Sequence, residues 1–137
     1  MSSLIELESM IAEFYRASVE RSQASSSKEI FLTFEKANRQ RMSSLDRVRR
    51  ETVIEMSLEP IMGLALEEHR FRVRRVIEDR NLGGRQKAIA LEDIIQGIYR
   101  EASRKLEYVS AEAFDLLNKF SLESSRRMDM LVAGNRT

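Results

Sequence analysis

The sequence contains no cysteine among its 137 residues. This absence excludes disulfides, thiolate metal sites, iron–sulfur clusters and cysteine nucleophiles. Glycine and proline are also scarce, at five and one residues, which leaves little material for the turns of a β-rich architecture. A chain of this length can bury a hydrophobic core without disulfides or a structural metal. We therefore predict a single all-α domain over residues 1–137.

Neither sign of charge dominates, because 23 Lys and Arg residues nearly balance 22 Asp and Glu residues and the formal net charge is +1. Nucleic acid is therefore an unlikely partner, and arginine-rich segments at 39–50 and 70–75 leave only a weak case for a nucleotide-associated helical protein. The first ten residues do not resemble a secretory signal, and no stretch is long enough to span a bilayer. We expect a cytoplasmic protein without a membrane partner.

Apolar residues recur at helical spacing in four long segments. The predicted helices cover residues 4–23, 27–55, 87–109 and 111–132, and a connecting helix is predicted over residues 60–81. Ser27 and Ser110 are the predicted N-caps of the second and last long helices. Gly83 and Gly84 are predicted to stop the connecting helix.

The inward face of the last helix follows from the same spacing. Its predicted core residues are Phe114, Leu117 and Met128.

An internal repeat relates the two halves of the chain. A shift of 84 positions places Glu8 on Glu92 and Tyr15 on Tyr99, and a shift of 83 then aligns the second helix of each half. The sequence thus predicts two helical hairpins, at about 4–56 and 85–132, around one core. A chance match of two amphipathic stripes is the alternative explanation.

The paired Glu and Tyr positions resemble the first and third helices of the rubrerythrin-type ferritin-like family. The resemblance implies a ferritin-like four-helix bundle with Tyr15 and Tyr99 in its core. It also implies a site for two metal ions, held by Glu8, Glu92 and a Glu-x-x-His unit on each of the other two helices.

The sequence departs from that family at the other ligand positions. Alignment places the two Glu-x-x-His units on Asn38 and Arg41, and on Ser121 and Ser124. Two carboxylates cannot saturate two divalent ions, and an arginine puts a fixed positive charge where a metal would sit. The pattern indicates a degenerate member of the family without a di-iron centre.

Glu8 and Glu92 fall on apolar stripes, where an unpaired carboxylate is costly. We predict a buried charge cluster in which Arg41 replaces the metal as the positive group and pairs with Glu8, Glu92 or both. Metal ligation by the two glutamates, or their escape to solvent at the end of the bundle, are the other interpretations.

The leading functional hypothesis is a non-catalytic, metal-free protein that acts through self-association or partner binding. No phosphate loop, nucleophile elbow or HExxH pair is present, so no catalytic residue and no cofactor are predicted. Apolar residues within Val53–Leu66 predict a homo-oligomer, with a dimer favoured.

The alternative function is an atypical oxidase or metal-binding protein that holds iron or another divalent metal. Its ligands would be Glu8, Glu92, Glu68 and His69. The competing interpretation for His69 is a hydrogen-bonded core or interface histidine, because it shares a helix face with apolar residues.

Overall fold

The computed structural model describes residues 1–22, 25–51, 60–63 and 65–134, and no β-strand occurs among them. The all-α prediction is confirmed. The helices with defined bounds are α1 (Ser2–Arg21), α2 (Ser25–Glu51), α4 (Leu66–Glu78), α5 (Gly84–Leu106) and α6 (Ala111–Gly134).

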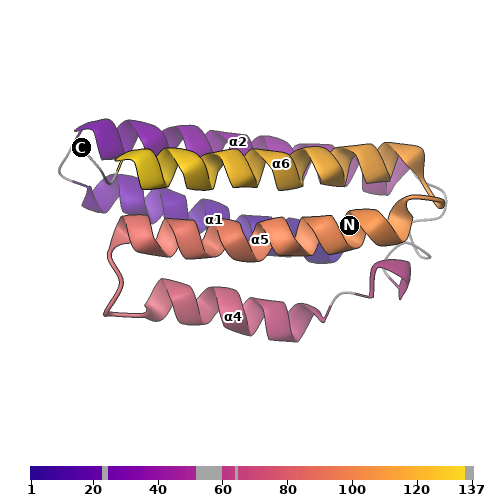
Figure 1. The fold of residues 1–137 in the computed structure, drawn as a ribbon, viewed down its shortest axis with the longest axis horizontal. Coiled ribbons are helices and arrows are strands. Elements are labelled where there is room, and N and C mark those ends of the chain that lie inside the picture. Colours follow the sequence, from indigo (N-terminus) through magenta and orange to yellow (C-terminus); the bar gives the residue numbers. More distant parts are fainter. Residues whose placement is uncertain (23–24, 52–59, 64, 135–137) are drawn as a thin grey trace.

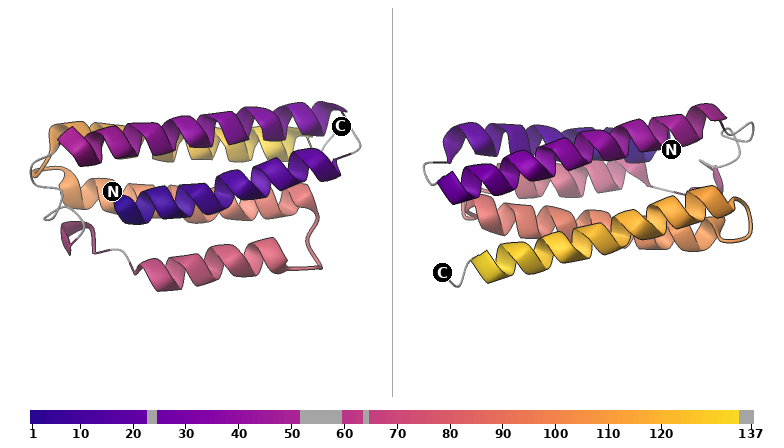
Figure 2. Two further views of the ribbon diagram at one scale, coloured as in Figure 1. Left: turned by 180° about the vertical axis from the view of Figure 1, so that it is seen from behind. Right: turned by 90° about the horizontal axis from the view of Figure 1, so that it is seen from above.

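Two pairs of helices form the body of the structure. Helix α1 packs along α2, and α5 packs along α6. Figure 1 shows these four helices lying side by side, with the first hairpin (α1 and α2) against the second (α5 and α6). Helix α4 contacts α1 and α5 and lies on the side away from α2 and α6, as the views in Figure 2 also show.

Helical periodicity explains why these segments bury one face. In α1, Leu4, Leu7 and Ile11 recur at three- and four-residue spacing and are almost completely buried, and in α5 Leu91 and Ile95 do the same. Burial of each such side chain contributes about 1.5–3 kcal/mol to folding. The core therefore runs lengthwise between the two hairpins.

The beginning of the second helix differs from the prediction. Helix α2 already includes Ser25, so Ser27 lies within its first turn and is not the N-cap. The end predicted at residue 55 lies outside the described residues, which reach Glu51 before the next gap.

The connecting segment is less continuous than the sequence pattern predicted. Residues 60–62 are helical, but Gly63 adopts φ 57°, a left-handed conformation that favours glycine and interrupts a right-handed helix. Helix α4 then ends at Glu78, and the Asp79 carboxylate accepts a hydrogen bond from the backbone N–H of Asn81 (2.9 Å). The turn begins with this aspartate, before the two glycines.

The double glycine belongs to the start of α5. Gly84 is the first residue of that helix, and the backbone N–H of Gly83 donates to Oε1 of Gln86 (3.0 Å). The glutamine thus satisfies the donor of the N-cap residue, as in a capping box.

The inward face of α6 is rotated from the predicted one. Leu117 is buried as predicted, whereas Phe114 and Met128 are only half-buried. The buried positions of the second half of α6 are instead Phe120, Ser121, Ser124, Arg127 and Leu131.

The N-cap of α6 provides a test of local stability. The backbone N–H of Ala113 donates to Oγ of Ser110 (3.2 Å), so the predicted cap is confirmed. We expect Ser110→Ala to lower the free energy of unfolding by about 0.5–2 kcal/mol. Ser43→Ala is the matched control, because Ser43 is exposed in the interior of α2 and alanine is the better helix former there. Urea titrations that rank the two variants equally would contradict the capping role.

Candidate functional site

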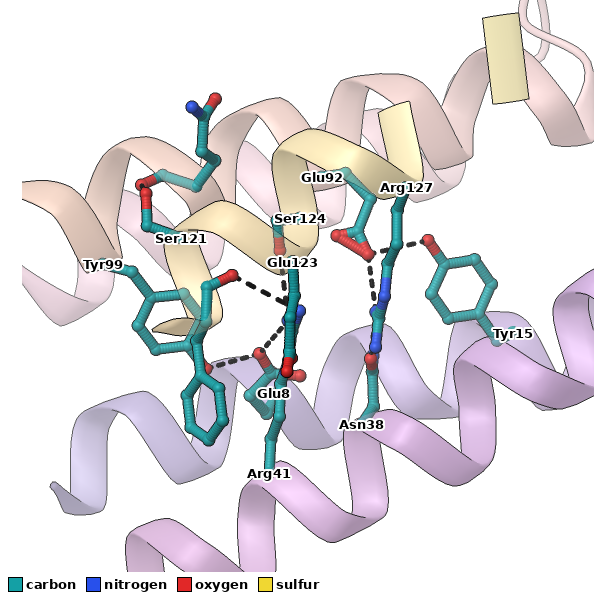
Figure 3. A network of polar contacts seen from close by, with 12 residues as sticks. Glu8, Tyr15, Asn38, Arg41, Glu92, Tyr99, Ser121, Glu123, Ser124 and Arg127 are labelled. Atoms are coloured by element: carbon teal, nitrogen blue, oxygen red, sulfur yellow. Dashed lines mark hydrogen bonds and ion pairs between the residues drawn. The ribbon is translucent and has the colours of Figure 1, made fainter. Parts of the chain in front are cut away.

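Two carboxylates and two guanidinium groups lie inside the structure, between the hairpins. Glu8 and Glu92 have no exposed surface, and Arg41 and Arg127 are 2% and 5% exposed. Figure 3 shows them with their polar neighbours: Glu8 comes from α1, Arg41 from α2, Glu92 from α5 and Arg127 from α6. Each of the four helices therefore contributes one charge.

Glu8 is held by one residue from each hairpin. Its Oε1 accepts a hydrogen bond from Nη1 of Arg41 (3.1 Å) and another from the hydroxyl of Tyr99. Burial raises the pKa of Glu8, although the charge of Arg41 and the hydrogen bond from Tyr99 act in the opposite direction. Burial also raises the pKa of Tyr99, which keeps its hydroxyl a donor.

Arg41 is satisfied on nearly all of its donors. Besides Glu8, it donates from Nη1 to Oγ of Ser124 (3.1 Å), from Nε to Oε2 of Glu123 (3.3 Å) and from Nη2 to the carbonyl of Phe120 (3.4 Å). Its guanidinium carbon also lies 5.2 Å from the centre of the Phe120 ring. Burial alone would lower the pKa of Arg41, but the charge of Glu8 holds it above the usual value.

Glu92 has a corresponding set of partners. Nη1 of Arg127 donates to Oε1 of Glu92 (2.7 Å) and also to Oδ1 of Asn38. The hydroxyl of Tyr15 donates to the same Glu92 oxygen (3.2 Å), and burial raises the pKa of Tyr15. Each glutamate thus pairs with an arginine of its own hairpin and a tyrosine of the other.

The predicted cluster of Glu8, Arg41 and Glu92 therefore has a fourth charged member. Arg41 is buried beside Glu8, as the sequence suggested, but the ion partner of Glu92 is Arg127. Arg127 was not among the predicted site residues, although it lies one helical turn beyond Ser124. The available signal was its place on the stripe Leu117, Phe120, Ser124, Arg127, Leu131.

The other positions that the family resemblance aligns with metal ligands carry neutral groups. Asn38 and Ser124 accept hydrogen bonds from the two buried arginines, each across the boundary between the hairpins. The hydroxyl of Ser121 donates to the carbonyl of Gln96 (3.3 Å), within the second hairpin. Asn38 and Ser124 therefore link the hairpins, and Ser121 does not.

One oxygen of each glutamate has no hydrogen-bond partner among the residues described. These atoms are Oε2 of Glu8 and Oε2 of Glu92. Nδ2 of Asn38 is likewise buried without a hydrogen-bond partner among these residues. Unpaired buried polar atoms are costly, so both carboxylates depend strongly on their Oε1 contacts.

The residues proposed for the metal alternative are not brought together. Glu68 is exposed and His69 is half-buried on α4, where Nδ1 of His69 lies 3.5 Å from Nη1 of Arg72. Burial and the charge of Arg72 lower the pKa of His69. Within the described ranges, no three His, Cys, Asp or Glu side chains are grouped closely enough to hold a metal ion.

Comparison with family models, curated proteins and solved structures finds no match to this chain. Of the helices described, none combines the length and apolar character needed to cross a membrane.

The two ion pairs predict a specific pattern of rescue. Arg41→Met leaves Glu8 buried without its cation, so we expect a loss of about 3–5 kcal/mol in the free energy of unfolding. Glu8→Gln in that background should recover part of the loss, because no buried anion is then stranded. Glu92→Gln should not rescue Arg41→Met, but it should rescue Arg127→Met.

Chemical denaturation of the single and double variants measures this pattern. Equal rescue by both glutamine substitutions, or less than about 0.5 kcal/mol lost in Arg41→Met, would contradict the pairing described here.

Proposed function

We propose that this protein is a non-catalytic, metal-independent helical protein that works through self-association or through binding of a protein partner. The observation that carries the proposal is the pairing of Glu8 and Glu92 with arginines. These are the two carboxylates that the family resemblance would assign to metal ions, and each already has a cation as its partner.

Electrostatics supports a metal-free centre. A pair of divalent ions brings four positive charges and needs several anionic oxygen ligands. The centre of this structure supplies two buried carboxylates, and the guanidinium groups of Arg41 and Arg127 already balance them. Metal entry would require both arginines to leave the core.

The proposal includes descent from a ferritin-like bundle built from two repeated hairpins. The support is the reciprocity of the contacts: Tyr99 donates to Glu8, and Tyr15 donates to Glu92. These four residues are among those that the shift of 84 positions superimposes. A duplicated hairpin would produce such a crossed arrangement.

Surface composition supports a role in association. Phe71 on α4 and Leu122 and Met130 on α6 are more than half exposed, which is unusual for large apolar side chains. Most of the predicted patch in Val53–Leu66 lies outside the described residues. Within it, Ile61 is 39% exposed and Met62 is buried. A cytoplasmic location and a homodimer are parts of the same proposal.

The metal alternative is tested by titration. We expect no stoichiometric binding of Fe²⁺, Mn²⁺ or Zn²⁺ by calorimetry, because the arginines neutralise both carboxylates. Glu8→Gln/Glu92→Gln is the matched control and should behave as the parent does. Two ions bound per parent chain, with loss of binding in the control, would establish the oxidase-type centre instead.

Self-association is tested by light scattering of the full chain. We expect a mass of at least twice 15.9 kDa at high micromolar concentration. Phe71→Ser tests the exposed face of α4 and Met130→Ser that of α6. The substitution on the face that forms the contact should raise the dissociation constant at least tenfold. A parent protein that stays monomeric under these conditions rules out the self-association branch and leaves partner binding.

A further inference from the structure

A cavity of about 350 Å³ lies between α2 and α6, beside the buried ion pairs. Both buried arginines contribute to its wall, and Figure 3 shows Arg41 and Arg127 extending between these two helices. The remaining lining includes Phe34, Ala37 and Met130, which are apolar, and Lys119, Glu123 and Arg126, which are charged. Its size is that of a small-molecule site.

Arg127 presents an unused guanidinium edge at this cavity. Both of its described hydrogen bonds leave from Nη1, toward Glu92 and Asn38. Across the described part of the chain, no acceptor bonds to its Nε or Nη2. These two groups form the fork that binds a carboxylate through two parallel hydrogen bonds. Arg41 differs, because its Nε, Nη1 and Nη2 all have acceptors.

The arginine is also held rigidly. Its guanidinium carbon lies 4.9 Å from the centre of the Phe34 ring, and its side chain is 6% exposed. A fixed, largely desolvated fork binds an anion without a large loss of side-chain entropy.

The charged groups around the cavity have a net charge that one anion would neutralise. Four cations line it, namely Arg41, Lys119, Arg126 and Arg127. Three carboxylates oppose them: Glu123 in the lining, and Glu8 and Glu92 behind the arginines. Subtracting three from four gives one positive charge in excess, so a monoanion would neutralise the group.

The shape of the cavity favours an elongated ligand. Its α2 residues run from Thr33 to Ser44 and its α6 residues from Lys119 to Met130, and each set recurs once per helical turn on one face of its helix. Each set forms one stripe about 16 Å long at 1.5 Å per residue. Phe34, Ala37 and Met130 lie near Arg127 along these stripes and offer apolar surface next to the fork.

From these observations we propose that the cavity between α2 and α6 binds a small organic monocarboxylate with an apolar body. The carboxylate accepts two hydrogen bonds from Nε and Nη2 of Arg127, and Arg126 and Lys119 add electrostatic attraction. The apolar body lies along Phe34, Ala37 and Met130. This binding site goes beyond the proposed metal-free function.

A monocarboxylate fits better than a phosphate for two reasons. The cavity group has one excess positive charge, and much of the wall near Arg127 is apolar, where a dianion would lose hydration without compensation. An apolar body instead gains from burial against that wall.

Calorimetry with octanoate on the full chain tests the site directly. We expect one octanoate per chain with a Kd of about 1 mM or tighter. Acetate supplies the charge without the apolar body, octylammonium supplies the body with the opposite charge, and inorganic phosphate supplies a different oxyanion. Each of these three probes should bind at least tenfold more weakly than octanoate.

Variants locate the binding. Ala37→Leu fills the cavity, so octanoate affinity should fall at least tenfold. Ala17→Leu is the matched control, because Ala17 is half-buried on α1, away from the cavity lining, and its affinity should equal that of the parent. Arg127→Lys keeps a cation for Glu92 but removes the two-pronged fork, so it should also lose at least tenfold.

Three results would overturn the proposal. Octylammonium binding as tightly as octanoate would reduce the site to a hydrophobic groove, and phosphate binding more tightly would assign a different ligand class. Unchanged octanoate affinity in Ala37→Leu would place any binding elsewhere. Because the Ala37 side chain takes part in no hydrogen bond or ion pair of the network, this last result remains decisive even if Arg127→Lys fails to fold.

Discussion

Burial of two carboxylates at the centre of the structure is the constraint on which the arrangement of the helices depends. An isolated ionised carboxyl cannot be placed in the interior without a large desolvation cost. Glu8 and Glu92 are fully buried, so each requires a cation at hydrogen-bond distance, and Arg41 and Arg127 supply it. Each pair lies within one hairpin, so the two helices of that hairpin must pack in the register that brings the carboxylate to its arginine.

The neutral contacts fix how one hairpin meets the other. The ion pairs of the two buried glutamates lie within hairpins. Tyr15, Tyr99 and Asn38 instead donate or accept across the boundary. A buried ion pair is weak evidence for stability, since apolar replacements often do as well. The value of the network here is geometric, because a slide of one hairpin along the other would leave the ion pairs of Glu8 and Glu92 intact but break the hydrogen bonds that Tyr15, Tyr99 and Asn38 make across the boundary. We therefore assign the network a role in specifying the packing.

Sequence periodicity was sufficient for the four long helices, because each buries a regular apolar stripe. It was insufficient where a single residue acts through its backbone or its side-chain hydrogen bond, as Gly63 and Asp79 do at the ends of the connecting segment. The pairing of Glu8 with Arg41 was predictable because a carboxylate on an apolar stripe needs a cation, and the family resemblance aligns Arg41 with a ligand position. Arg127 was missed because the repeat aligns Arg41 with Ser124. In addition, the helical spacing predicted Met128 as the buried residue of that turn.

Arg127 lies one helical turn beyond Ser124, the residue that the repeat aligns with Arg41. This difference makes the two halves of the buried charge cluster chemically unequal. Arg41 stands level with Ser124, so its donors reach α6 and are consumed by Ser124, Glu123 and the backbone of Phe120. Arg127 lies one turn further along α6, where the facing residues of α2 include Phe34 and Ala37, neither of which has a side-chain acceptor. Its second edge therefore has no described partner and borders the cavity. The guanidinium of Arg41 is thus closed by its protein partners, whereas that of Arg127 has one edge that borders the cavity.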